Sequence, residues 1–187
     1  MKIIKLLIIS SAIISLPVQA VDTEALTKEA RGVSMSFGKA LKGHLMGGMK
    51  AGGPVNALTV CNTKAPEVTQ AAGQSSGWGV ARTSLKLRNT SNAPDAWERS
   101  VLQQFEERKI AGEDITKMEA TEVINADGRK TFRYMKAVPT VGPCVLCHGA
   151  EIAPEVEAKI KQLYPQDKAR GFKPGDIRGA FTLQKAL

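Results

Sequence analysis

The fold class is decided by residues 120–138, which read ATEVINADGRKTFRYMKAV. Two strand-like runs, 120–125 and 129–138, flank the pair Asp127-Gly128. An Asp-Gly pair between two such runs favours a tight reverse turn. The segment therefore predicts an antiparallel β-hairpin, which is the strongest local signal in the chain.

Further elements are expected on both sides of the hairpin. Alternating apolar and polar residues predict strands over 78–88 and 177–184. Apolar residues at helical spacing predict helices, which run over 23–47, over 55–63 with a polar helix or turn over 64–73, from Asp95 past Phe105, and over 154–164. Gly52-Gly53-Pro54 is expected to break the chain between the first two. This order predicts one α+β domain in which helices flank a central antiparallel sheet of about four to five strands.

Downstream of the hairpin, residues 142–149 read GPCVLCHG and contain a single C-x-x-C-H box. The spacing is that of covalent haem attachment, in which two thiols form thioether bonds to the haem vinyl groups and the adjacent histidine becomes an axial iron ligand. In a helical or turn-like segment, Cys144 and Cys147 reach one edge of the macrocycle and His148 lies beneath it. The box therefore predicts one haem c per chain.

Two other interpretations of the box compete with haem. A thioredoxin-like redox pair shares the C-x-x-C spacing, but it belongs to a βαβ unit, which the predicted elements lack. A zinc site would use Cys61, Cys144, Cys147 and His148 as a three-cysteine, one-histidine set. That set requires the adjacent Cys147 and His148 to bind the same ion, which is a strained arrangement. We therefore expect haem.

Residues 1–20 have the features of a secretory signal peptide. Lys2 and Lys5 precede an apolar stretch, and Val18-Gln19-Ala20 fits the small-x-small cleavage rule. An uncleaved membrane anchor is the alternative, but the apolar stretch is short for a bilayer. We expect cleavage after Ala20, a periplasmic mature chain over 21–187, and no stable insertion of that chain into a membrane.

The chain of 187 residues is basic, with 26 Lys and Arg, 18 Asp and Glu, and a formal net charge of +8. In an exported protein this balance gives no reason to expect nucleic acid as a partner. It suits the carboxylates of haem propionates and an acidic redox partner protein, whose approach it would steer in a salt-dependent way.

The ligand on the second face of the iron stays open from the residues alone. The candidates are a thiol, an imidazole or a thioether, supplied by Cys61, His44, or one of Met35, Met46, Met49, Met118 and Met135. Cys61 ranks slightly ahead, because haem attachment consumes the other two cysteines and leaves it without a disulfide partner in an oxidising compartment. Its plain alternative is a small buried side chain in the core.

Several separated stretches form a more specific pattern. They are 60–66 (VCNTKAP), 79–89 (GVARTSLKLRN), 92–95 (NAPD), 143–149 (PCVLCHG), 164–165 (YP), 167–169 (DKA), 171–172 (GF) and 175–181 (GDIRGAF). Together they resemble the motifs of a family of periplasmic or lumenal single-haem c-type cytochromes with a PAS-like fold. The resemblance covers nearly the whole mature chain, and none of the matching motifs departs from the family pattern.

The resemblance implies a PAS-like domain with a long N-terminal helix and with Cys61 as the axial ligand opposite His148. An anionic sulfur ligand stabilises ferric over ferrous iron, so this ligation predicts a low reduction potential. Independently of the resemblance, Arg82 and Arg178 are candidates for pairing with the propionates, because buried carboxylates need partners. Weaker candidates for that role are Lys86 and Arg88, and candidates for walling the pocket are Trp78, Phe132, Phe172 and Phe181.

These features predict an exported c-type cytochrome that carries electrons at low potential or senses redox state. The alternative is a haem-based sensor of CO, NO or O2 that acts through a partner protein, because a thiolate released on reduction would open the iron to a small ligand. A peroxidase-like catalyst needs an acid–base pair beside an open iron position, and only His44 is available for it. We therefore expect a carrier or sensor rather than an enzyme.

Overall fold

A four-stranded antiparallel sheet with the order β1-β4-β3-β2 forms the centre of the fold. The computed structural model describes residues 21–187, so the predicted signal peptide lies outside the described residues. The strands are β1 (Gly79–Thr83), β2 (Glu119–Ala126), β3 (Arg129–Pro139) and β4 (Ile177–Ala186). The predicted α+β class with a central antiparallel sheet is confirmed.

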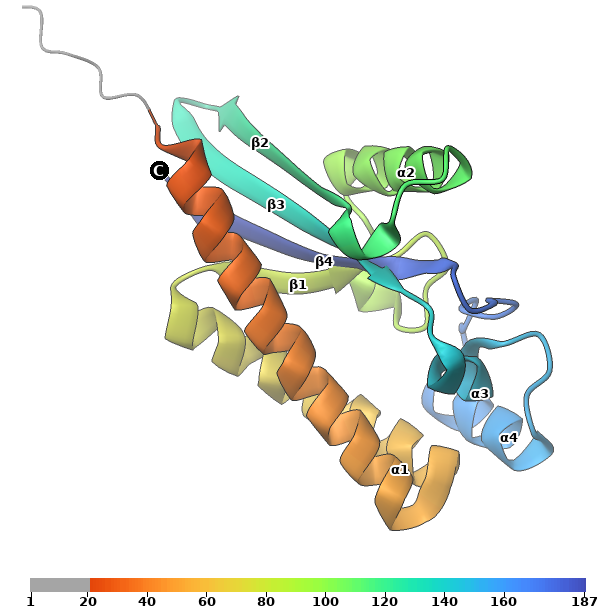
Figure 1. Cartoon of the computed structure of the whole chain (residues 1–187). Helices are drawn as coiled ribbons and strands as arrows, with labels where there is room; N and C mark the ends of the chain where they lie inside the picture. Colours follow the sequence, from red (N-terminus) through yellow and green to blue (C-terminus); the bar gives the residue numbers. More distant parts are fainter. Residues whose placement is uncertain (1–20) are drawn as a thin grey trace, which may run out of the picture.

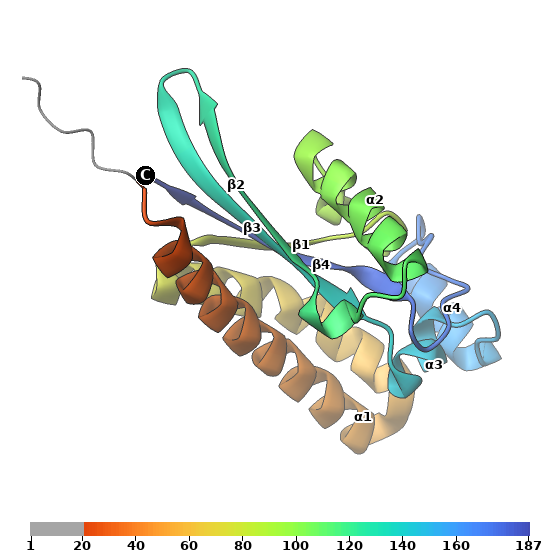
Figure 2. The ribbon, with the colours of Figure 1, turned by 45° about the horizontal axis from the view of Figure 1, so that its top comes forward.

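Helices cover both faces of this sheet. In Figures 1 and 2, α1 (Thr23–Ser76) lies on one face and α2 (Ala96–Ile110) lies on the other. Side chains alternate along β3, so Phe132 and Tyr134 pack in a cluster with α1, whereas Met135 and Ala137 pack against Phe105 of α2. Among residues 21–187, no helix is long and apolar enough to cross a bilayer.

The helix α1 consists of two arms that meet at Gly52 and Gly53, whose backbone angles are not helical. Gly53 has a φ of 67°, a region that favours glycine. The first arm passes its predicted end near Gly47 and Gly48 and continues to this break. The second arm is one helix, although two short segments were expected, because burial of side chains along it outweighs the helix-breaking tendency of Pro66.

The predicted hairpin is present as β2 and β3, and its ladder closes with Ala126 paired to Arg129. Asp127 and Gly128 have φ angles of 51° and 74°. Two positive φ values in a two-residue loop define a type I′ turn, whose twist matches that of the strands. A second prediction was too long: β1 ends at Thr83 and does not run to residue 88, because the Ser84 hydroxyl accepts from the Lys86 amide at 3.2 Å and turns the chain out of the sheet.

The strands β3 and β4 are neighbours in the sheet, but a long excursion joins them. It contains a 3-10 turn (Gly142–Cys144), α3 (Val145–His148) and α4 (Pro154–Leu163). Two main-chain hydrogen bonds close its base, from the Thr140 amide to the Asp176 carbonyl at 2.7 Å and from the Gly175 amide to the Thr140 carbonyl at 2.9 Å. The C-x-x-C-H box therefore lies at the end of the sheet opposite the hairpin turn (Figure 1).

Candidate functional site

Three segments meet around the C-x-x-C-H box: the second arm of α1, the β1 loop (84–88) and the β4 loop (164–176). Main-chain hydrogen bonds hold the β4 loop between the box and the β1 loop. Phe172 donates its amide to the His148 carbonyl at 2.9 Å, and Lys168 donates its amide to the Leu87 carbonyl at 2.7 Å. The β4 loop thus brings its own side chains next to those of the box and of the β1 loop.

The box itself forms one helical turn. The 3-10 turn runs directly into α3, and Cys144 and Cys147, three residues apart, lie on the same side of it. All three cysteines of the chain are half-buried and free. The turn ends at Gly149, whose amide donates to the Val145 carbonyl at 2.9 Å; a Cβ at this position would lie 2.6 Å from that oxygen. A glycine is therefore required directly after the histidine.

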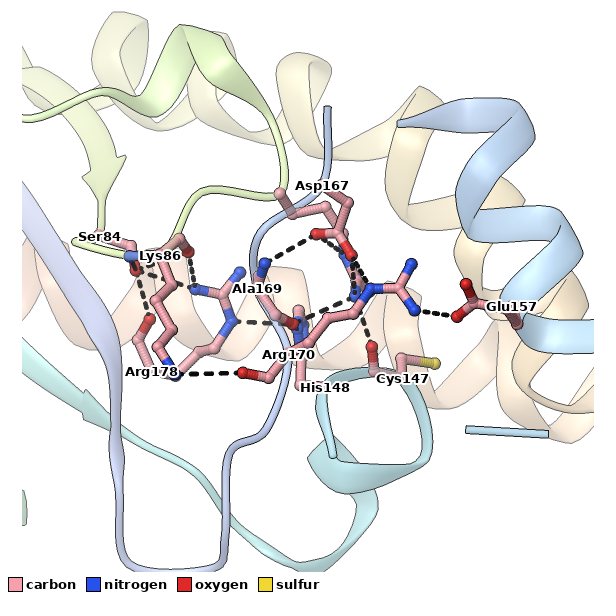
Figure 3. A network of polar contacts seen from close by, with 10 residues as sticks. Ser84, Lys86, Cys147, His148, Glu157, Asp167, Ala169, Arg170 and Arg178 are labelled. Carbon is pink, nitrogen blue, oxygen red and sulfur yellow. Dashed lines mark hydrogen bonds and ion pairs between the residues drawn. The ribbon is translucent and has the colours of Figure 1, made fainter. Parts of the chain in front are cut away.

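His148 is held with one ring nitrogen toward the protein and the other toward the site (Figure 3). Its Nδ1 lies 2.9 Å from the Ala169 carbonyl oxygen, which accepts, so Nδ1 carries the proton. The Nε2 lone pair accepts from Nε of Arg178 at 3.3 Å. Burial, and then the charge of Arg178, lower the pKa of His148 to about 2. The ring is therefore neutral, which is the form that binds metal ions.

Arg178 is the cation closest to this ring. Its Nη1 donates to the Ser84 hydroxyl at 3.1 Å and to the Lys86 carbonyl at 3.3 Å. Its guanidinium carbon lies 5.3 Å from the centre of the Phe172 ring. Burial lowers the pKa of Arg178 to about 10, so the side chain stays charged at neutral pH.

Cys61 lies beside the box on the second arm of α1. Leu58, one turn earlier, packs in the same cluster as Cys147. Burial raises the pKa of the Cys147 thiol, the charge of Arg88 lowers it, and the charge of Cys61 raises it. Burial raises the pKa of Cys61 itself, whereas the positive charges of Arg82 and Arg88 lower it. The structure thus brings Cys61 and the box together.

Arg82 is a half-buried cation that makes no ion pair with any residue in the part of the chain that the structure describes. Burial lowers the pKa of Arg82, and the charges of Tyr164 and Cys61 raise it. A partly desolvated guanidinium without a carboxylate partner can bind an anion that enters the site.

Asp167 is a residue that the sequence reasoning missed. It forms an ion pair with Arg88, with Nε and Oδ1 3.1 Å apart and with side chains that are only 10% and 2% exposed. Arg88 was a weaker candidate for the propionates, and the structure places it in this pair instead. Asp167 belongs to one of the recognised motifs, but its partner is 79 residues away and no local signal joins them.

Four of the other candidates for a second axial ligand lie elsewhere. His44 and Met46 are exposed on the first arm of α1. Met118 and Met135 are buried beneath α2, on the opposite face of the sheet. The structure therefore brings none of these four side chains to the box.

The two competing interpretations of the box find no support. Over residues 21–187, no group of three or more His, Cys, Asp or Glu side chains is arranged to hold a metal ion, which argues against the zinc set. The box itself lies in a helix that is one turn long, and the strands joined by this excursion, β3 and β4, are antiparallel, so the βαβ unit of a thioredoxin-like pair is missing there.

One of the four aromatic side chains expected to wall the pocket lies at the site. Phe172 packs edge-on against His148, with ring centres 6.1 Å apart. Trp78 and Phe132 contact each other in the core beneath α1. Phe181 packs against Phe37 with ring centres 5.1 Å apart. For these three residues the expectation was wrong, because they fill the space between α1 and the sheet.

The donor set suits the cofactor that the box predicts. Two half-buried thiols lie on one side of a helical turn. The adjacent imidazole has its proton fixed on Nδ1, and the lone pair of Nε2 accepts from Arg178. Arg82 and Arg178 add positive charge beside the thiol of Cys61 and the ring of His148. Thiols, a neutral imidazole and cations for carboxylates are the groups that haem c requires.

Fold and site together define a PAS-like α+β protein whose C-x-x-C-H box lies in the crossover between two central strands. The sequence model of the Tll0287-like family matches residues 11–185, which is nearly the whole chain. The chain belongs to this family.

A solved structure with a similar fold is that of the cyanobacterial heme-protein Tll0287. The TM-score is 0.61 and the sequence identity 23%, and the match covers 89% of this chain and 96% of that chain. At this identity the likeness shows a common fold. No curated protein matches the chain.

Proposed function

We propose that the chain is an exported c-type cytochrome that holds one haem c through Cys144 and Cys147, with His148 and Cys61 as axial ligands. The observation that carries the proposal is the fixed ring of His148, whose Nδ1 is bonded to the Ala169 carbonyl while Nε2 keeps its lone pair. The similar solved structure is described as a heme-protein, which supports the same cofactor here.

Each side chain of the site has a defined part in this proposal. Haem, when bound, supplies the one-electron couple of its iron. Cys61 offers an anionic sulfur, which favours the ferric state and a low potential. Arg82 and Arg178 offer positive charge to the propionates. Because Arg178 now donates to Nε2, iron at that nitrogen would displace its guanidinium, and a propionate is an acceptor that the displaced group can use.

The ligation is tested with the holoprotein, produced together with a c-type cytochrome maturation system. We expect Cys61→Ala to change the ferric absorption spectrum strongly and to raise the midpoint potential, because an electron-rich ligand is lost. The matched control is His44→Ala, which removes an exposed side chain away from the box. Equal spectra for Cys61→Ala and wild type would refute Cys61 as the second ligand, and a change in His44→Ala would favour His44.

The covalent attachment has its own test. We expect Cys144→Ser or Cys147→Ser to lose most haem stain on denaturing gels, because each removes one thioether bond. Cys61→Ala should keep the stain, since Cys61 has no part in attachment. A wild-type protein that is colourless after co-production with the maturation system would refute haem binding.

The proposed role is electron transfer or redox sensing at low potential, and the alternative is sensing of a small ligand through a partner. The two are separated by mixing the ferrous protein with CO. A six-coordinate ferrous protein that excludes CO supports the carrier. Rapid CO binding, together with loss of the Cys61 ligand on reduction, supports the ligand sensor.

A further inference from the structure

A buried ion pair lies directly behind the histidine of the box. Arg88 comes from the β1 loop and Asp167 from the β4 loop, and their side chains are almost fully enclosed. Arg88 reaches Asp167 with two nitrogens, Nε at 3.1 Å and Nη2 at 3.3 Å. The same Nη2 donates to the carbonyl of Cys147 and, at 3.4 Å, to the carbonyl of Ala169. One guanidinium therefore joins the box, the β4 loop and a buried carboxylate.

The pair holds Ala169, the residue whose carbonyl orients His148. Asp167 accepts the Ala169 amide at 3.0 Å, and the Ala169 carbonyl accepts from Nδ1 of His148 at 2.9 Å (Figure 3). Arg88 bonds to that same carbonyl and to the main chain of Cys147, the residue before His148. Both partners of the pair thus act on the histidine through a single residue, Ala169.

A buried ion pair is weak evidence for stability, because desolvation of two charges offsets their attraction. Its better-attested use is to fix one arrangement among several, and outer-shell partners of a metal-ligating histidine fix its tautomer and its ring orientation. Arg88 is suited to this role, because its planar guanidinium bonds a carboxylate and two carbonyls in a fixed geometry, whereas the ammonium of a lysine is a compact point charge without that fork.

We propose that Arg88 and Asp167 are positioning residues for the axial histidine: they hold the Ala169 carbonyl that orients His148, and their balanced charges tune the potential of the iron. The proposal rests on the proposed haem ligation by His148. It is distinct from an anion-binding role for Arg88, because the donors of its Nε and Nη2 are directed at protein acceptors.

The proposal predicts shifts of opposite sign in the midpoint potential. Asp167→Asn, which is nearly isosteric, leaves the charges of Arg88 and Arg170 uncompensated beside the box. Added positive charge favours ferrous iron, so the potential should rise. Arg88→Met removes a positive charge and leaves the negative charge of Asp167 less compensated. Added negative charge favours ferric iron, so the potential should fall. A purely structural role would loosen the site in both variants and shift the potential in one direction.

The matched control is Glu98→Gln. It breaks an ion pair of similar burial, since Arg133 and Glu98 are 11% and 12% exposed, on the α2 side of the sheet and away from the box. We expect it to lower the unfolding midpoint without moving the redox potential. If Arg88→Met retains no haem, Arg88→Lys replaces it; this variant keeps the charge but not the fork, so it should keep a near-wild-type potential and broaden the low-spin ferric EPR signal.

Failure of this inference is distinguishable from failure of the proposed function. A wild-type protein without haem, or a haem-loaded protein whose spectrum ignores His148→Ala, would refute the ligation itself. A loaded protein that responds to His148→Ala, but whose Asp167 and Arg88 variants match Glu98→Gln in potential and EPR signal, would overturn the positioning role alone. Shifts of the same sign in Asp167→Asn and Arg88→Met would also overturn it.

Discussion

The close contact between the two arms of α1 gives a sharp test of the fold, because two adjacent glycines differ in their surroundings. At Gly47 an added Cβ would meet nothing within 4 Å, whereas at Gly48 it would lie 2.8 Å from Ala57 Cα and 3.3 Å from the Val60 side chain. Replacing glycine by alanine inside a helix stabilises it by about 1 kcal/mol. We therefore expect Gly47→Ala to stabilise the protein by up to about that amount.

At Gly48 the gain in helix propensity meets a steric cost. Carbon atoms in contact prefer a separation of about 3.5–4.0 Å, so the arms would have to move apart by about 1 Å. Overpacking of this kind costs about 1–3 kcal/mol. The net effect of Gly48→Ala is then a loss of about 0–2 kcal/mol, and the two variants should differ by about 1–3 kcal/mol.

The assay is denaturant unfolding of both variants beside wild type, supported by thermal melts in which 1 kcal/mol corresponds to about 2–4 °C. Val60 precedes Cys61, so Gly48→Ala should also disturb the ferric spectrum of the haem-loaded protein, and Gly47→Ala should not. Equal stabilisation by the two substitutions would refute the close packing of the arms at Gly48.

Three further outcomes are expected. Phe105→Ala, at a side chain with 0% exposure, should cost about 3–5 kcal/mol in urea unfolding, whereas Ile110→Ala, at 84% exposure, should cost little; similar losses would contradict the core beneath α2. Gly128→Ala should cost about 1–2 kcal/mol, because φ at this position is 74°, and an unchanged unfolding midpoint would argue against the type I′ turn. Hydrogen bonds from Arg31 lower the pKa of Glu119, so this carboxylate contributes stability above its ordinary pKa of about 4.3 that is lost as the pH falls toward the folded pKa. Glu119→Gln should therefore flatten the acid limb of a stability–pH curve, and an unaltered limb would contradict the pairing.

The parts of the fold that sequence predicts well are those in which neighbouring residues decide the structure. The Asp127-Gly128 turn needs two positive φ values, and an Asp-Gly pair is a sequence that favours them. The start of α2 is equally local, because Asp95 and Glu98 form a capping box at its first turn. Both elements form where the sequence predicts them.

The break of α1 at Gly52 and Gly53 lies where the Gly-Gly-Pro run predicts it, but the end of the first arm was harder to place, because glycine has two uses. Gly48 is small so that another helix can approach it, whereas Gly53 is flexible so that the chain can turn. Sequence alone does not distinguish small size from flexibility, so the pair Gly47-Gly48 favours a helix end where the structure has none. The burial of Ala57, Leu58 and Ala65 on the second arm also depends on neighbours that the local sequence does not reveal.

The candidate site likewise has a part that the local sequence predicts and a part that depends on distant segments. Cys144, Cys147 and His148 form a contiguous motif, and their chemistry follows from spacing. The approach of Cys61 to the box came from the resemblance and depends on the helix α1 folding back on itself. The pair of Arg88 and Asp167 joins two loops far apart in the chain, and no periodicity or turn signal reports such a contact.

The sheet order determines when the sheet can close relative to the synthesis of the C-x-x-C-H box. β4 is the last strand in sequence, yet it lies between β1 and β3, and β1 pairs with β4 alone. During vectorial synthesis or export the C-x-x-C-H box therefore emerges before the strand that closes the sheet. Until then, β1 has no partner strand, and the segment with the cysteine pair is not enclosed by the completed sheet. If these sulfurs are joined to haem as proposed, the enzyme that attaches it would have access to them until the final strand docks.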